Sequence, residues 1–239
     1  MVVRAAAVLA VLAVLGVYYG VSEHLPELPQ WGDVAFVGLA LMPLTFLLVW
    51  LALPLRETGP RELAVAAVSL VVLAVILEWA GLDIAANFVK LAAVAAAGWW
   101  FLGLFEALSW VLLVALLIIP VDSFSVARGP TKEIVENQPQ VFNALSVSFP
   151  LPGQHSSAQL GLPDILFFSL FLGAAARFGL RVGWTWLAMA LSFGTTLALA
   201  VGFDLAGLPA LPLLSAAFVL VNADLIWRAY KEGSARPSK

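Results

Sequence analysis

Long apolar stretches alternate with short polar breaks along almost the whole chain. A helix needs about 20 apolar residues to cross a hydrocarbon core about 30 Å thick. By that measure the pattern predicts an all-α polytopic membrane helix bundle with about eight (eight or nine) transmembrane helices. The eight segments cover approximately residues 2–21, 34–55, 62–80, 84–103, 106–127, 163–179, 182–202 and 208–228. Proline and glycine residues mark several of the breaks, for example Gly59 and Pro60.

Only one predicted connection is long, and it covers residues 128–161. Connections of more than about 12–15 residues are usually functional or disordered. The loop contains a β-prone run at 141–149. The chain is therefore divided into N-terminal transmembrane helices at 1–105 and a second region at 106–239, which includes the loop and is expected to carry the function.

Composition excludes the soluble classes of protein. Hydrophobic residues make up 62% of the 239 residues and charged residues 11%, whereas soluble domains are about 45–50% apolar and about 25% charged. A net charge of −3 without a basic run argues against a nucleic-acid partner. The absence of cysteine excludes disulfides and thiol nucleophiles. His24 and His155 lie in predicted loops without a ligand cluster, so neither a metal nor a cofactor is expected.

The basic residues predict an orientation in the membrane. With eight spans both termini share one side, which collects nine Lys and Arg residues against three on the other side. The positive-inside rule then places the termini in the cytoplasm and the 128–161 loop outside. The first segment is too long for a signal peptide and is expected to be an anchor. A small chain without cysteine or extramembrane domains suggests a prokaryotic cell membrane.

Two aspartates occupy positions that call for an explanation. A carboxylate inside a bilayer costs several kcal/mol unless it is paired or hydrated. Asp122 lies about a turn and a half before the end of a very apolar helix, and Asp164 begins the next one. Consecutive helices run antiparallel, so both carboxylates are expected at similar depth near one membrane face. The remaining acidic residues, Asp33 among them, fall in predicted loops or near helix ends.

A facing pair of carboxylates has a definite chemistry. Two carboxylates about 3 Å apart cannot both ionise, so the pair holds one proton near neutral pH. Its ionised member can activate a water and its protonated member can protonate a leaving amide nitrogen. Asp164, at a helix N-terminus, is the expected base. Two structural roles remain possible: Asp164 as a helix N-cap after Pro163, and Asp122 as a polar helix–helix contact beside Pro120.

From residue 121 onward the chain resembles the presenilin and signal-peptide-peptidase group of intramembrane aspartyl proteases. That family has one aspartate in a Tyr-Asp motif near the end of the sixth helix. A second aspartate stands in a Gly-x-Gly-Asp motif that opens the seventh helix, and a Pro-Ala-Leu motif precedes the last one. Here Asp122 matches the first aspartate, Gly161-Leu162-Pro163-Asp164 resembles the second motif, and Pro209-Ala210-Leu211 matches the third. The resemblance covers about residues 106–228.

The resemblance implies an aspartic endopeptidase that cleaves transmembrane-helix protein substrates within the lipid bilayer. Asp122 and Asp164 would be catalytic, no cofactor would be needed, and the substrate would be bound by Gly161, Leu162, Pro209, Ala210 and Leu211. Independently of the resemblance, Pro209 and Pro212 block a regular helix start and leave backbone N–H and C=O groups unpaired. Unpaired backbone groups at membrane depth are tolerated only where they are buried in protein or line a water-filled cavity. Those groups, or the edge at 159–162, can pair with an extended substrate.

The chain departs from the family at three points. Val121 replaces the aromatic residue, Pro163 replaces the second glycine, and five predicted spans precede the loop instead of six. A prepilin-type peptidase is the nearest protein class with similar chemistry, and the Pro-Ala-Leu match disfavours it. Two non-proteolytic functions are also compatible with the pattern: a proton-coupled transporter that uses the carboxylates as a relay, and a helical scaffold in which they form a structural contact. The substrate and the oligomeric state are left open.

Overall fold

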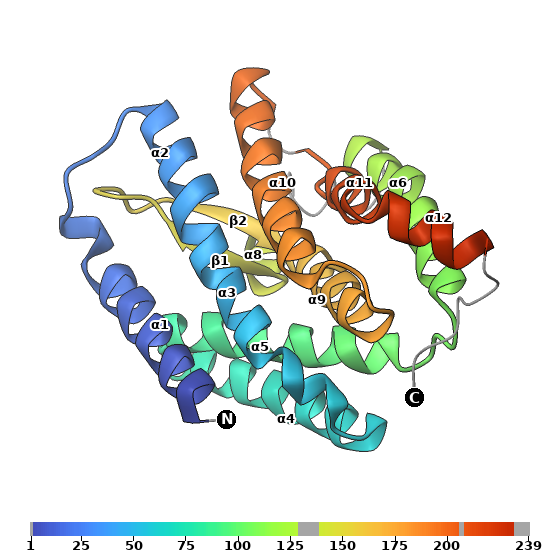
Figure 1. Ribbon diagram of the computed structural model, residues 1–239. Coiled ribbons are helices and arrows are strands. Elements are labelled where there is room, and N and C mark those ends of the chain that lie inside the picture. The colour runs from blue at the N-terminus through green and yellow to red at the C-terminus, as the bar shows by residue number, and fades with distance from the viewer. Residues whose placement is uncertain (1, 129–138, 206–207, 232–239) are drawn as a thin grey trace.

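A computed structural model describes residues 2–128, 139–205 and 208–231 of the chain, and helices dominate it (Figure 1). Apolar sequences with few turn residues form its long helices, because helix is the one local structure that satisfies every backbone group within a single segment. The long helices are α1 (Val2–Val21), α4 (Pro60–Trp79), α5 (Asp83–Leu102), α6 (Leu108–Arg128) and α10 (Val182–Gly202).

The second span is built from several helical pieces. It comprises α2 (Gln30–Phe36), the π-helical turn η2 (Val37–Leu41), α3 (Met42–Ala52) and the 3-10 turn η3 (Leu53–Glu57). A short 3-10 turn, η1 (Ser22–His24), closes the end of α1. These pieces continue one another, so the segment as a whole is long enough to cross a membrane.

A close backbone contact joins η2 to α10. A Cβ atom placed on Gly38 would lie 2.8 Å from the Cα of Gly194, and one placed on Gly194 would lie 2.8 Å from the carbonyl oxygen of Gly38. Neither position has room for a side chain. Small residues allow helices in membranes to approach in this way, where packing rather than the hydrophobic effect holds them together.

The long apolar helices indicate a membrane protein, but the expected count of eight or nine spans is not confirmed. Among the described residues six segments are long and apolar enough to cross a membrane, and α11 (Leu211–Val221) with α12 (Ala223–Lys231) makes a seventh if the pair is one span. This pair is bent by 64°. Helices form at all eight predicted positions, but α9 (Leu162–Arg177) has only 16 residues, fewer than the 17–25 or so of a typical span.

A buried asparagine fixes the bend between α11 and α12. Asn222 is completely buried, and its side-chain amide donates hydrogen bonds to the Thr185 hydroxyl at 2.8 Å and to the Phe218 carbonyl at 2.9 Å. Its side-chain oxygen accepts a hydrogen bond from the Arg181 N–H at 2.9 Å. The amide is thus fully paired, which is what a buried polar group requires.

A β-hairpin is the one departure from the all-α expectation within the described residues. Strand β1 (Ser146–Pro150) pairs in antiparallel fashion with β2 (Ser157–Gly161), and the short helix α8 (Pro139–Ala144) precedes it. The β-prone run predicted at 141–149 is therefore helical at its start and a strand at its end. The hairpin lies inside the long predicted loop and leads directly into α9.

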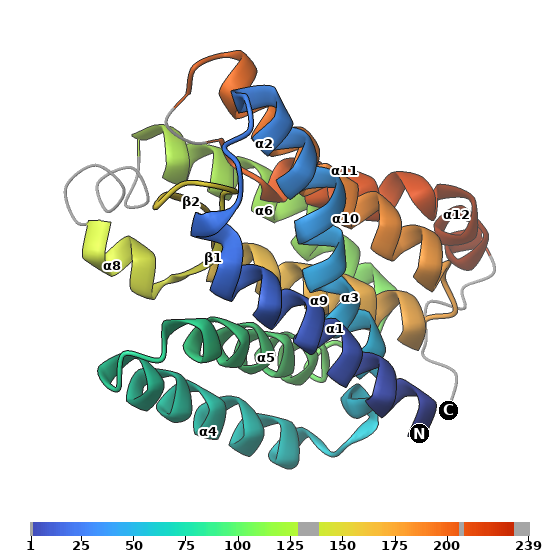
Figure 2. The same cartoon turned by 90° about the vertical axis from the view of Figure 1, so that its left-hand side faces the viewer.

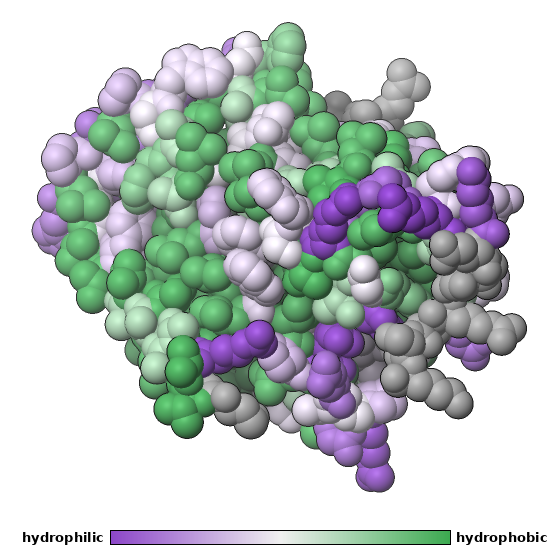
Figure 3. Space-filling model, viewed as in Figure 1, coloured by the Kyte–Doolittle hydropathy of each residue, from purple (hydrophilic) through white to green (hydrophobic). Residues whose placement is uncertain are grey.

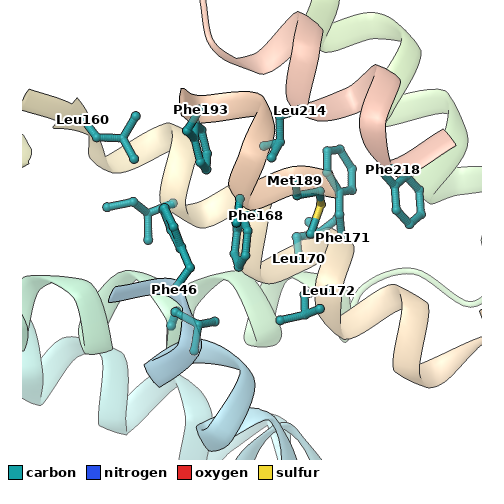
Figure 4. Close-up of a cluster of buried hydrophobic side chains, with 14 of the residues drawn as sticks. Phe46, Leu160, Phe168, Leu170, Phe171, Leu172, Met189, Phe193, Leu214 and Phe218 are labelled. Atoms are coloured by element: carbon teal, nitrogen blue, oxygen red, sulfur yellow. The ribbon is translucent and has the colours of Figure 1, made fainter. Parts of the chain in front are cut away.

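Helix α9 occupies the centre of the molecule, with α4 and α5 on one side of it and α10 and α11 on the other (Figures 1 and 2). Aromatic rings pack around it, as Figure 4 shows. The rings of Phe46 and Phe168 have centroids 4.2 Å apart, and Phe171 stacks on Phe218 at 4.8 Å. Because protein surrounds α9, its short length does not need to match the thickness of a membrane.

The outside of the molecule carries the opposite pattern to that of a soluble protein. Figure 3 shows apolar residues over much of one face, with the most hydrophilic residues gathered toward its lower right. Large apolar side chains on α4 are exposed, for example Val68 at 66% and Trp79 at 91%. An extended apolar surface of this kind fits contact with lipid.

Candidate active site

Asp122 on α6 and Asp164 on α9 line the same cavity, which has a volume of about 600 Å³. The two carboxylates are close enough to interact electrostatically. Strand β2, the later half of α10 and the segment 208–210 form much of the remaining wall. The cavity therefore joins two acidic groups from consecutive helices with a strand and an irregular segment.

Asp122 is held by the first turn of α11. Its Oδ2 accepts a hydrogen bond of 3.1 Å from the backbone N–H of Leu211, which is the first residue of that helix. The first N–H groups of a helix have no partner inside it, so the start of α11 supplies a free donor. The irregular segment with Pro209 just before α11 places this donor over the carboxylate.

Asp164 is the third residue of α9 and lies against the end of β2. Its carboxylate interacts with the backbone N–H of Gly161, the N-cap residue of the helix. This arrangement corresponds to the half of a capping box in which the third helical residue reaches back to the N-cap. A Cβ atom on Gly161 would lie only 3.2 Å from Asp164 Oδ2, so the glycine leaves the carboxylate the space it occupies.

Both carboxylates thus lie beside the N-terminus of a helix. Asp164 is in the first turn of α9, and Asp122, a residue of α6, contacts the first residue of α11. The position of Asp164 at a helix N-terminus is the sequence feature that predicts it to be the base. Because Asp122 shares that property, the helix dipole does not distinguish the two roles. Of the two structural roles considered, the N-cap role of Asp164 is wrong, because Gly161 is the N-cap of α9. Asp122 does form a polar contact between helices, through the Leu211 N–H of α11.

The outer edge of β1 is closed by a side chain of α5. Asn87, which is 5% exposed, accepts a hydrogen bond from the Ser148 N–H at 2.8 Å and donates one to the Ser148 carbonyl at 3.0 Å. The Tyr19 hydroxyl donates a second hydrogen bond to the same carbonyl at 2.7 Å. The backbone groups at the centre of this edge are therefore already paired, and no further strand can add there.

The outer edge of β2 borders the cavity. Ser148 is opposite Gln159. When the backbone N–H and C=O of one residue in an antiparallel pair point away from the partner strand, those of the residue directly opposite also point away. Since the Ser148 backbone is bonded to Asn87, the backbone N–H and C=O of Gln159 also point outward. No hydrogen bond within the described part of the chain fills these two groups, and every residue of β2 lines the cavity. This edge is open.

The expected substrate residues do not all line the cavity. Gly161, Pro209 and Ala210 do. Leu211 instead contributes its N–H to Asp122. Leu162 extends the hairpin by one more hydrogen bond, from its N–H to the Leu145 carbonyl at 2.9 Å. These two residues support the site through their backbones.

The two sequence departures beside the aspartates have different positions in the structure. Val121 is 65% exposed and is not among the residues that line the cavity. Pro163 does line the cavity, in the first turn of α9. Proline is tolerated in a first turn because the N–H that it lacks has no helical partner there. Pro163 is thus compatible with the start of the helix that carries Asp164.

One acidic residue near the site was not expected. Asp33 was assigned to a loop, but it lies in α2, is 8% exposed, and accepts a hydrogen bond from the Gln154 side chain at 2.8 Å. The second span begins at Gln30, four residues before its predicted start, which places Asp33 inside it. The apolar pattern alone gave no signal for this, because the polar first turn of the helix resembles a loop.

Within the residues that the structure describes, no group of three or more His, Cys, Asp or Glu side chains is placed to hold a metal ion.

A scan against protein-family models and a search of the curated proteins found no match to this chain. The function must therefore be inferred from the geometry of the site.

Proposed function

We propose that the chain is a multi-pass intramembrane aspartyl endopeptidase that hydrolyses peptide bonds in or near the transmembrane helices of other proteins. The observation that carries the proposal is that Asp122 and Asp164, from consecutive antiparallel helices, line one cavity beside an open strand edge. An acidic pair supplies the chemistry of hydrolysis, and an open strand edge supplies a means of holding an extended peptide. The resemblance of the three motifs to the presenilin group points to the same activity.

The dyad would hydrolyse the bond with a water molecule. The ionised carboxylate takes a proton from the water molecule while the water oxygen attacks the peptide carbonyl carbon. The protonated carboxylate donates its proton to the amide nitrogen as the C–N bond breaks, which leaves a new carboxyl group and a new amine. The N–H groups of Leu211 and Gly161 hold the two carboxylates in place for this exchange.

A helical substrate has to unwind before it can be cut, because its own turns shield the scissile amide. Unwinding inside a membrane exposes backbone groups that cost several kcal/mol each if left unpaired. The outward N–H and C=O of Gln159 on β2 offer replacement hydrogen bonds, as in known cases of strand addition. The closed edge of β1 leaves β2 as the side of the hairpin on which the substrate adds.

The proposal is tested with a single-span reporter protein incubated with the pure enzyme in detergent micelles, with products identified by intact mass. The wild type is expected to cut the reporter within or near its span, and Asp122→Asn and Asp164→Asn are expected to leave it uncut. Asp83→Asn, a change at an exposed acid on the first turn of α5, is the matched control and should cut normally. Cleavage by either dyad variant at the wild-type rate would refute the proposal.

The cleavage experiment, with two further measurements, separates a protease from a transporter or a scaffold. A transporter or a scaffold would leave the reporter intact with every variant, including the wild type. Retained binding of the reporter by an inert wild type would identify a scaffold. Uptake of protons into liposomes that depends on Asp122 and Asp164 would identify a relay.

A further inference from the structure

A second cavity continues the candidate active site at the far end of β2. It has a volume of about 430 Å³ and includes the side chain of Asp33 in its lining. Four residues line both cavities: Ser157, Ala158, Leu197 and Val201. A peptide that follows the open edge of β2 away from Asp164 therefore passes the mouth of this second cavity.

Asp33 has unused hydrogen-bonding capacity in this cavity. Its Oδ2 is bonded to Gln154, but its Oδ1 is buried and has no hydrogen-bond partner within the described residues. The hydroxyl of Tyr18, which interacts electrostatically with Asp33, donates instead to the Pro150 carbonyl at 2.7 Å. None of the ion pairs formed by the described residues includes Asp33. A buried carboxylate oxygen without a donor is destabilising, and a cationic ligand would relieve it.

The remaining walls of the cavity restrict which cation fits. Six of the lining residues are apolar, among them Leu28, Val34 and Leu197. Gln30, Gln154 and Ser157 are polar but uncharged, so the Asp33 carboxylate is the one ionisable group in the lining. Lysine and arginine combine an apolar stem with a cationic head that donates hydrogen bonds. A side chain of this kind places its stem along the leucine and valine walls and its head on Asp33. A small hydrated metal ion would leave these apolar walls without a partner.

We propose that the Asp33 cavity is a subsite that binds a Lys or Arg side chain of the substrate about four residues from the scissile bond. This inference rests on the proposed protease function. The spacing follows from β2. The scissile carbonyl would lie beside Asp164 and Gly161, and the cavity opens at Ser157, four residues earlier in the strand. At about 3.4 Å per residue this is a distance of about 14 Å. The preferred substrates are then spans with a basic residue near the cut.

The test compares reporters that differ only in carrying Lys or Gln at single positions about three to five residues to either side of the mapped cut. For the wild type, Lys at one of these positions should raise kcat/KM by about tenfold or more, the contribution of a charge-assisted hydrogen bond. Asp33→Asn should bring the ratio of kcat/KM for the Lys and Gln reporters to about one. Asp83→Asn should keep the wild-type ratio.

A second variant covers the case in which Asp33→Asn does not fold. Leu28→Trp adds bulk at a side chain that is 38% exposed and lines only the Asp33 cavity. It should reduce the preference for Lys over Gln, because the added bulk fills the subsite. An unchanged preference in a folded Asp33→Asn or Leu28→Trp protein would overturn the inference.

Binding separates failure of the subsite from failure of the protease function. If the wild type cuts the Gln reporter but cuts no Lys reporter faster, the subsite inference is wrong and the protease proposal stands. If the wild type cuts neither, the protease proposal is wrong, and the affinity of fluorescent Lys and Gln reporters for the wild type and for Asp33→Asn decides the subsite. Tighter binding of Lys that depends on Asp33 would support the subsite, and equal affinities would overturn it.

Discussion

At the scale of single residues, the site depends on how closely backbone approaches the two carboxylates. Asp122 accepts a hydrogen bond from the N–H of Leu211, and the Asp164 carboxylate lies against the backbone of Gly161, whose N–H interacts with it. Both donors belong to the first turn or the N-cap of a helix, where backbone N–H groups are free. Main-chain groups therefore position the carboxylates. Side-chain substitutions elsewhere on the surface are expected to disturb these main-chain groups little.

Gly161→Ala tests this arrangement. The added Cβ would lie 3.2 Å from Asp164 Oδ2, so either the carboxylate or β2 must shift. A displacement of about 1 Å in an active site can cost about a hundredfold in rate, and we expect a loss of about tenfold to a hundredfold in reporter cleavage with little change in thermal stability. Gly20→Ala, where an added Cβ meets nothing within 4 Å, is the control. Equal rates for the two variants would contradict the account.

The sequence was sufficient to single out Asp122 and Asp164, because a carboxylate near the end of an apolar span is conspicuous without any structure. It was not sufficient for Asp33 or Asn87. Their burial results from contacts with the hairpin, through Gln154 and Ser148, which lie more than sixty positions away in the chain. Hydropathy is a local property and carries no information on such pairings.

At the scale of elements, the hairpin gives the cavity its direction. Asn87 holds β1 to α5 by two hydrogen bonds, so the free edge is that of β2. The sequence predicted the helices well because apolar length determines them, and it predicted a β-prone run in the long loop. It misplaced the start of the strand, because α8 takes up residues 139–144. It also took α9 as an ordinary span, since hydropathy does not reveal that a helix is surrounded by protein.

Asn87→Ala is expected to loosen the hairpin. The variant leaves the Ser148 N–H without a partner, and an unsatisfied buried group costs about 1–3 kcal/mol. We expect a lower midpoint of thermal unfolding in detergent and slower cleavage of the reporter, since the open edge of β2 is no longer held beside the dyad. Asn143→Ala, at an exposed side chain on α8, should change neither quantity. If Asn87→Ala behaves like this control, the hairpin does not depend on the contact.

At the scale of the whole molecule, the cavity lies toward one end of the bundle. The hairpin, the start of α9 and the end of α6 meet there, whereas η3 and the end of α9 lie at the opposite end. The eight-span topology expected from the sequence assigns nine Lys and Arg residues to the side of that opposite end and three to the side of the hairpin. The positive-inside rule therefore predicts that the dyad works near the outer face of the membrane.

Cysteine labelling measures this orientation, because the chain contains no cysteine of its own. His155 on the hairpin turn and Glu57 at the end of the second span have side chains that are 91% and 71% exposed. In intact cells a membrane-impermeant thiol reagent should label His155→Cys, and it should label Glu57→Cys only after the membrane is permeabilised. The reverse pattern would show that the protein is inserted in the opposite orientation.

The most direct test of the central claim compares kcat/KM for reporter cleavage by Asp122→Asn, Asp164→Asn and the double variant. Residues that act as one unit are strongly non-additive, since losing either abolishes the shared step. Each single variant is expected to fall to the same residual rate as the double variant, while all three keep the wild-type unfolding midpoint. Substantial activity in one single variant, or a further loss in the double variant, would show that the two carboxylates do not form a catalytic pair.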